Sequence, residues 1–122
     1  MIADLQNVRN MDRLESLDSI RLLFDRICDK HHFCVLGKLE HQFDPHGITV
    51  IYMLSESHLS IHTFPEKQYF ALDIYTCREY EDDSVYLSMY QEIVKWFDCD
   101  YGEGPLIVNR GVRLNTRIFA YS

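Results

Sequence analysis

Two runs of strand-forming residues, separated by a short turn, limit the folds open to this chain more than any other feature. The runs are His58 to Phe64 and Tyr69 to Thr76, both rich in β-branched, aromatic and apolar residues. The turn between them is Pro65-Glu66-Lys67-Gln68. These features predict an antiparallel hairpin, and alternation along a strand places His62 on the same face as His58.

Two further strands are predicted before this hairpin. They are Phe33 to Phe43 and Ile48 to Leu54, and the turn signal Asp44-Pro45-His46-Gly47 joins them. Both alternating faces of the second run are largely apolar, which is typical of a sheet that is covered on both sides. One layer of helices covers only one side. We therefore expect the other side to meet a second subunit.

Two amphipathic helices accompany the strands. Apolar spacing predicts one helix from Arg13 to Lys30, with Asp12 or Ser16 as the residue that caps its start. Asp83-Ser84 caps a second helix of roughly 14 residues. A strand at Ile2 to Val8 precedes them, and two short strands are expected near Leu106-Val108 and Arg117-Ala120. This order predicts a two-layer α+β sandwich, in which a mostly antiparallel sheet carries two helices on one face.

Length and charge narrow the class of protein. The 122 residues suit a single domain spanning residues 1–122. A formal net charge of −7 argues against nucleic acid and against an anionic membrane surface as partners. No apolar run approaches the roughly 18 residues of a membrane span, and no signal peptide is visible. A small cationic substrate suits the charge better.

The cysteines and histidines indicate no metal site. The cysteines are Cys28, Cys34, Cys77 and Cys99. They form no CxxC pair, so neither a zinc knuckle nor a thioredoxin-like motif is predicted. His31 and His32 are sequence neighbours, which point apart on a helix. Without a secretion signal we expect reduced thiols and a cytoplasmic protein.

Ser57, His62 and Cys77 supply a nucleophile, a base and an acid within a short stretch. We expect the hairpin to bring His62 and Cys77 toward one sheet edge, with Ser57 at the strand entrance. The residues alone leave a second interpretation open. In it, Ser57 belongs to a turn, His62 is a hydrogen-bonded strand residue and Cys77 is a small buried hydrophobe.

The motif that contains these residues resembles a known family. Ser-Glu-Ser-His-Leu-Ser-Ile-His-Thr-Phe-Pro-Glu at 55–66, followed by Ala-Leu-Asp-Ile-Tyr-Thr-Cys at 71–77, is similar to the core of the small bacterial and archaeal S-adenosylmethionine decarboxylases. The resemblance is dense from Phe43 to Cys77 and looser in the flanks. It implies a pyruvoyl-dependent homodimer that decarboxylates S-adenosylmethionine to S-adenosylmethioninamine for polyamine (spermidine) synthesis.

The resemblance also implies self-cleavage. Ser57 attacks the carbonyl of Glu56, which divides the chain into residues 1–56 (the β chain) and 57–122 (the α chain). Residue 57 becomes a covalent pyruvoyl group, which forms a Schiff base with the substrate. No protein side chain can delocalise the electrons that decarboxylation leaves behind, so such a group is needed.

Three further residues take catalytic roles by the same resemblance. His62 is the proton acceptor in processing, and Cys77 is the proton donor in catalysis. Thr49 stands where the family often has a serine that assists processing. The reference pKa of imidazole, about 6.5, and of a thiol, about 8.5, suit these proton transfers. His58 is assigned packing or hydrogen bonding only.

Four residues are expected to bind substrate. They are Phe43 and Phe64, which stack on adenine, Glu66, which binds the ribose hydroxyls, and Asp4, which matches an acidic residue of the family's first strand. The chain departs from the usual pattern at three positions, namely Gln68, Phe70 and Arg78, where the family commonly has small residues. Two alternatives stay open: a pyruvoyl-dependent arginine or ornithine decarboxylase on the same scaffold, and a non-catalytic dimerising paralogue.

Overall fold

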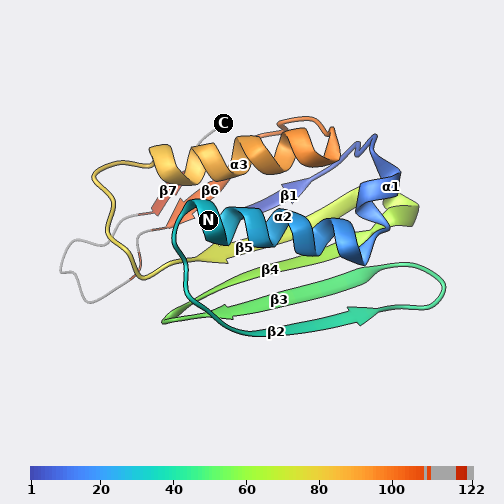
Figure 1. The fold of residues 1–122 in the computed structure, drawn as a ribbon. Helices are drawn as coiled ribbons and strands as arrows, with labels where there is room; N and C mark the ends of the chain where they lie inside the picture. The colour runs from blue at the N-terminus through green and yellow to red at the C-terminus, as the bar shows by residue number, and fades with distance from the viewer. Residues whose placement is uncertain (109, 111–117, 121–122) are drawn as a thin grey trace.

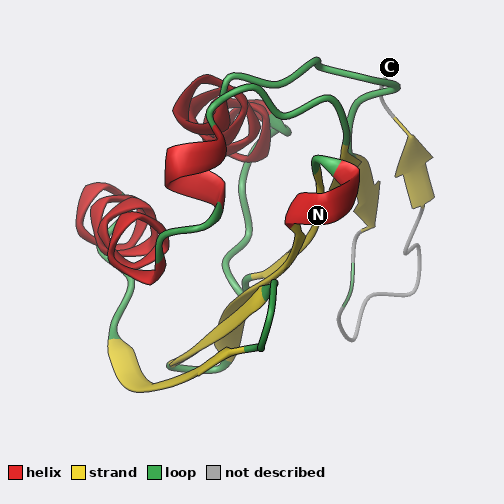
Figure 2. Cartoon of the chain, turned by 90° about the vertical axis from the view of Figure 1, so that its right-hand side faces the viewer, coloured by secondary structure: helices red, strands yellow, loops and turns green. Residues whose placement is uncertain are grey.

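The computed structural model describes residues 1–108, residue 110, and the backbone of residues 118–120. Its strands form one antiparallel sheet with the order β2-β3-β4-β5-β1-β6-β7 (Figure 1). The α-helices of the described residues lie on one face of that sheet (Figure 2). The predicted α+β sandwich is therefore confirmed. No helix among the described residues is both long and apolar enough to cross a membrane.

The elements follow the predicted order. They are β1 Ile2–Leu5, α1 Met11–Leu14, α2 Leu17–Lys30, β2 Val35–Gln42, β3 Ile48–Leu54, β4 Ser57–Phe64, the 3-10 turn η1 Pro65–Lys67, β5 Tyr69–Tyr75, α3 Ser84–Phe97, β6 Leu106–Val108 and β7 Ile118–Ala120. The expected closing strand included Arg117, which lies outside the described residues. The other predicted strands agree with the structure to within a few residues.

The single helix predicted from Arg13 to Lys30 is wrong at its start, because the structure has two helices there. Ser16 separates them in an extended conformation, and its hydroxyl accepts a hydrogen bond from the Ser19 amide at 3.1 Å. This is an N-cap, which satisfies an amide that a helix start leaves unpaired. Asn10 caps α1 in the same way, through the Arg13 amide at 3.1 Å.

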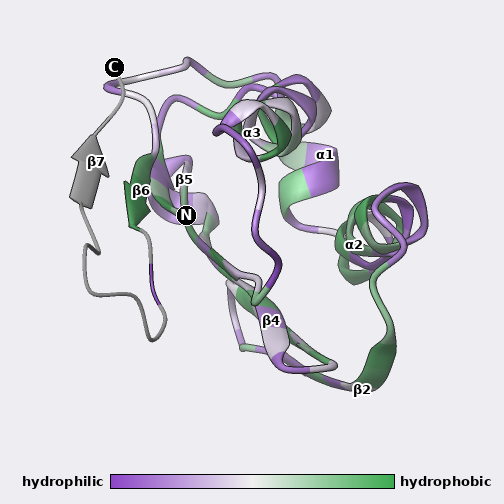
Figure 3. Cartoon of the chain, turned by 90° about the vertical axis from the view of Figure 1, so that its left-hand side faces the viewer, coloured by the Kyte–Doolittle hydropathy of each residue, from purple (hydrophilic) through white to green (hydrophobic). Residues whose placement is uncertain are grey.

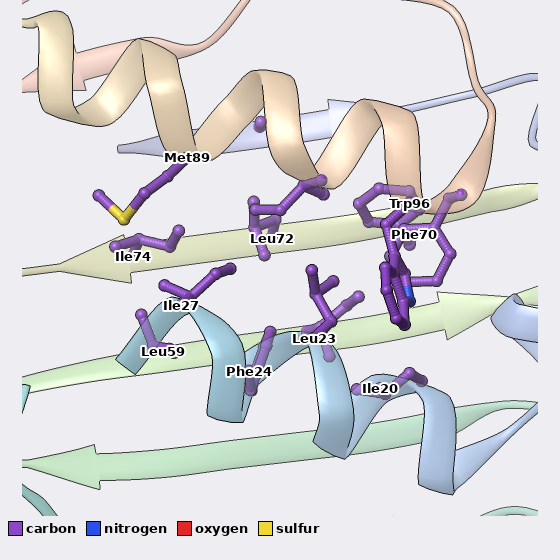
Figure 4. Close-up of a cluster of buried hydrophobic side chains, with 14 of the residues drawn as sticks. Ile20, Leu23, Phe24, Ile27, Leu59, Phe70, Leu72, Ile74, Met89 and Trp96 are labelled. Atoms are coloured by element: carbon purple, nitrogen blue, oxygen red, sulfur yellow. The ribbon is translucent and has the colours of Figure 1, made fainter. Parts of the chain in front are cut away.

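The core lies between the sheet and the helices α2 and α3. Figure 4 shows side chains of both helices meeting those of β4 and β5. Phe70 of β5 is fully buried against Phe97 of α3, with ring centroids 4.7 Å apart. On β3 and β4, alternate residues are buried beneath the helices, and Figure 3 shows the hydrophobic side of α2 turned toward the sheet. Burial of this apolar surface is the main stabilising contribution.

No helix of the described residues lies on the opposite face of the sheet (Figure 2), and large apolar side chains are exposed on it. Leu39 of β2 is 72% exposed, Met53 of β3 is 55% exposed and Ile2 of β1 is 48% exposed. Pairing in register places Leu39 beside Ile51 and Gly37 beside Met53 on this face. Clustered apolar exposure of this kind is typical of an interaction surface. We call this surface the uncovered face.

Candidate active site

The turn between β3 and β4 holds the expected cleavage point. Leu54 pairs with Ser57, so only Ser55 and Glu56 connect the strands. Glu56 has φ = 60°, in the left-handed region. For a residue with a side chain this conformation costs about 1 kcal/mol. The Ser55 amide donates to the carbonyl of Cys34 at 3.0 Å, which fixes the turn to the residue that precedes β2.

Ser57 and Cys77 lie together, as predicted. The Cys77 backbone amide donates a hydrogen bond to Ser57 Oγ at 3.0 Å. The contact arises because His58 pairs with Tyr75, which leaves Cys77 just beyond the end of β5 and next to the start of β4. Cys77 is exposed, so the expectation of a small buried hydrophobe does not hold. Glu56, Ser57 and Cys77 are called the cleavage half-site below.

The structure contradicts the prediction that the hairpin brings His62 and Cys77 toward one sheet edge. His62 pairs with Ala71, close to the turn of the hairpin, whereas Cys77 follows the open end. His62 is five residues from Ser57 along β4, which at about 3.3 Å per residue is roughly 16 Å. A nucleophile and its base need hydrogen-bonding distance, so Ser57 and His62 of one chain are too far apart to act on each other directly.

His62 instead pairs with Thr49. Its Nδ1 lies 2.8 Å from Thr49 Oγ1, and the two residues are register partners on β3 and β4. Both side chains lie on the uncovered face, because the residues that alternate with them, such as Val50 and Ile61, are buried under the helices. The ring is therefore exposed and held through one nitrogen.

Asp4 and Phe64 lie on the same face, and Tyr69 connects them. Asp4 of β1 pairs with Ala71, the residue that also pairs with His62. The pKa of Tyr69 is raised, first by burial and then by the neighbouring Asp4 carboxylate, which accepts its hydrogen bond. The Tyr69 and Phe64 rings are 5.3 Å apart. Sequence reasoning missed Tyr69, although its position opposite Phe64 in a hairpin was the signal that could have found it.

Phe43 and Glu66 lie at the same end of the sheet. Phe43 follows β2 and donates its amide to the carbonyl of Gly47 at 2.8 Å. Gly47 has φ = 105°, and an added Cβ would lie 3.2 Å from the Thr63 carbonyl, so the turn packs closely on β4. Glu66 is exposed in η1. We call the following group the His62 half-site: Asp4, Phe43, Thr49, His62, Phe64 and Glu66.

Two departures from the usual pattern leave the uncovered face unchanged. Phe70 points into the core beneath α3. Gln68 has φ = 50°, and its side-chain amide donates to the carbonyl of Val8 at 3.3 Å, which ties the hairpin turn to the segment after β1.

His58, the neighbour of Ser57, has Nε2 3.5 Å from Asp73 Oδ2, in agreement with the hydrogen-bonding role expected of it.

The cysteines are expected to differ in reactivity. Burial raises the pKa of both Cys28 and Cys99 to about 11, whereas Cys34 and Cys77 are exposed. The thiolate is the reactive form, so a raised pKa leaves little of it at pH 8. Iodoacetamide at pH 8 should modify Cys34 and Cys77 and spare the other two until the protein unfolds. Peptide mass spectrometry over time measures this, and equal rates at all four thiols would contradict the arrangement.

Comparisons with known proteins agree with one another on the family. The family model described as S-adenosylmethionine decarboxylase matches residues 1–99. The S-adenosylmethionine decarboxylase proenzyme of Sulfurihydrogenibium sp. (strain YO3AOP1) is 38% identical over 77 residues, covering 63% of this chain and 57% of that relative. The S-adenosylmethionine decarboxylase proenzyme 2 of Bacillus anthracis is 60% identical over 43 residues, covering 35% of each. The matched stretches thus span about half or less of these relatives.

A solved structure is similar over nearly the whole chain. The crystal structure of the adenosylmethionine decarboxylase from Aquifex aeolicus VF5 matches with a TM-score of 0.68 and 25% sequence identity. The similarity covers 98% of this chain and 86% of that one. The sheet and helices described above are therefore also found in that adenosylmethionine decarboxylase.

Proposed function

This chain belongs to the S-adenosylmethionine decarboxylase family, and from that premise we propose that it is a self-cleaving, pyruvoyl-dependent decarboxylase of S-adenosylmethionine. The product is S-adenosylmethioninamine, which serves polyamine synthesis. The observation that carries the proposal is the contact of Ser57 Oγ with the Cys77 amide, beside a strained Glu56. Four cysteines without disulfides are consistent with a cytoplasmic enzyme.

Self-cleavage uses atoms that the turn already brings together. Ser57 Oγ attacks the carbonyl carbon of Glu56, and the C–N bond to residue 57 breaks as the ester C–O bond forms. A base, His62, then removes the α-hydrogen of residue 57. The Cβ–Oγ bond breaks, and Glu56 leaves as a carboxylate that keeps the serine oxygen. The remaining dehydroalanine tautomerises and takes up water, releasing ammonia and leaving a pyruvoyl end at residue 57.

The strain at Glu56 favours this cleavage. The left-handed conformation is imposed by the two-residue turn and lies on the residue whose carbonyl is attacked. Breaking the peptide bond to residue 57 releases this strain, so the barrier to self-cleavage can fall by up to about 1 kcal/mol. These features fit the formation of a pyruvoyl group at this position.

Catalysis assigns separate tasks to the remaining residues. The pyruvoyl group supplies the electron sink that lets the substrate lose carbon dioxide. Cys77 adjoins residue 57 and donates the proton that the substrate α-carbon then needs. Phe43 and Phe64 offer flat rings for adenine and for the sulfonium charge, worth about 0.5–2 kcal/mol per contact. Glu66 accepts hydrogen bonds from the ribose hydroxyls.

A homodimer completes the site. The uncovered face presents exposed apolar side chains and His62, whereas the cleavage half-site lies at the other end of the strands within one protomer. Packing two such faces about a two-fold axis that runs between the sheets, across the strands, brings each cleavage half-site to the partner's His62 half-site. His62 then serves Ser57 of the other chain, and burial of Leu39 and Met53 stabilises the pair.

The nucleoside substrate is favoured over a basic amino acid. Arginine and ornithine have no purine on which Phe43 and Phe64 could stack. They also have no ribose hydroxyls for Glu66 to bind. A net charge of −7 also attracts a sulfonium cation.

Intact mass and carbon dioxide release test the proposal. Purified protein in reducing buffer should give two fragments that divide between residues 56 and 57, the second carrying a pyruvoyl end. Carbon dioxide should come from carboxyl-labelled S-adenosylmethionine and not from labelled arginine or ornithine. Release from either amino acid alone would support the alternative decarboxylase. A chain that stays intact would overturn the enzyme and favour a non-catalytic paralogue.

A further inference from the structure

We propose that Arg78 is a positioning residue that holds Cys77 beside residue 57 once the chain has been cleaved. The inference rests on the proposed function, because it concerns the proton donor of that reaction. Arg78 does not touch the reacting atoms in this role. It acts through the backbone of its neighbour, Cys77.

Arg78 anchors the segment after β5 to the end of helix α2. One guanidinium nitrogen donates to the carbonyl of His31 and another donates to the carbonyl of His32 at 2.5 Å. The guanidinium carbon lies 4.8 Å from the centroid of the Phe33 ring. A cation is favoured at a helix C-terminus, where carbonyls lack partners, and a planar group that stacks and donates twice has a defined orientation.

Three contacts hold Cys77 in the uncleaved chain. Its own amide donates to Ser57 Oγ at 3.0 Å. On one side, Thr76 Oγ1 lies 2.7 Å from the hydroxyl of Tyr86 in α3. On the other side is the Arg78 anchor on α2. Pairing of β5 with β4 ends at Tyr75, so no strand pairing holds Cys77 itself.

Cleavage removes the first of these contacts. The serine oxygen leaves residue 57 with the new carboxylate of Glu56, so the Cys77 amide loses Oγ as its acceptor. The mature enzyme then depends on Thr76 and Arg78 to place the thiol. Self-cleavage precedes this loss. A change at Arg78 should therefore affect turnover far more than it affects cleavage.

The decisive variant is Arg78→Ala, with Arg13→Ala as its matched control. Arg13 makes the same kind of contact elsewhere: it donates to the carbonyl of Trp96 at 3.0 Å, and its guanidinium carbon lies 4.0 Å from the Trp96 ring centroid. It belongs to neither half-site. Both variants lose an arginine that binds a helix-end carbonyl and stacks on a ring. Only Arg78→Ala should misplace Cys77.

The measurements are the rate constant of self-cleavage, kcat, KM and the midpoint of thermal unfolding. For Arg78→Ala we expect cleavage within about twofold of the parent, since the contact of Cys77 with Ser57 remains, and kcat lower by about 10- to 100-fold, since small misplacements of a catalytic group have effects of this size. KM should stay within about twofold, because Arg78 is outside the His62 half-site. Arg78→Lys, with one ammonium for two carbonyls, should give an intermediate kcat.

Each outcome decides the role. Arg13→Ala should keep parental kcat even where its unfolding midpoint falls as far as that of Arg78→Ala. If kcat of Arg78→Ala equals that of the parent, or falls only in proportion to cleavage, the positioning role is overturned. If Arg13→Ala loses kcat equally, the effect belongs to stability and the role is again overturned. A parent that neither cleaves nor releases carbon dioxide overturns the proposed function itself, and this role with it.

Discussion

Ser57→Ala should leave the chain intact at 122 residues and abolish carbon dioxide release. Alanine has no oxygen to attack the Glu56 carbonyl, so no ester forms and no pyruvoyl group is made. The loss should reach the detection limit, because no other hydroxyl takes that place in the turn: Ser57 Oγ is the one held by the Cys77 amide. Intact mass after long incubation and a labelled-carboxyl assay measure both effects.

Ser55→Ala is the matched control for this variant. Ser55 precedes Glu56 in the same turn. Its backbone amide donates to the carbonyl of Cys34, and alanine retains that hydrogen bond. An exposed substitution of this kind changes stability by less than about 0.5 kcal/mol. It should therefore cleave within about twofold of the parent. Cleavage of Ser57→Ala at the same bond, or a block in Ser55→Ala equal to that in Ser57→Ala, would show that the nucleophile is wrongly assigned.

The sequence predicts the strands well because their limits are local signals. Alternation together with the turns on either side gives β3 as Ile48 to Leu54, which the structure confirms to the residue. Ser16 is confirmed as a helix cap, but the division into two helices there was not predicted, since apolar spacing continues across it through Leu14, Leu17 and Ile20. The Ser16 hydroxyl caps the start of α2 there, and the spacing of apolar residues gives no signal of such a cap.

The site could be predicted only in part. Alternation gives the face on which His62 lies, but the distance from His62 to Ser57 depends on strand length and register. In a hairpin, residues near the turn and residues at the open end are far apart, which separates His62 from Cys77. The Arg78 anchor was also beyond sequence reasoning, because its acceptors lie 46 and 47 residues away and the long side chain has many rotamers.

The separation of the half-sites predicts complementation between two inactive chains. His62→Ala alone should stay uncleaved, because no base removes the α-hydrogen of residue 57. Ser57→Ala alone should also stay uncleaved. When both are produced in one cell with separable tags, a mixed dimer contains one complete site, made from Ser57 and Cys77 of the first chain and His62 of the second. Random pairing then allows cleavage of about half of the His62→Ala chains.

The identity of the cleaved chain makes this result specific. Only the chain that carries His62→Ala has Ser57, so the chain that lacks the base should be the one that is cut, and the Ser57→Ala chain should stay whole. The matched control replaces the second chain by Ser57→Ala/His62→Ala, which pairs equally well but supplies no base, and no cleavage should follow. If His62→Ala is cut on its own, His62 is not the base. If the mixed dimer forms but stays uncut, each protomer must build its site alone, which would require β4 to bring His62 to Ser57 against the register that pairs His62 with Ala71.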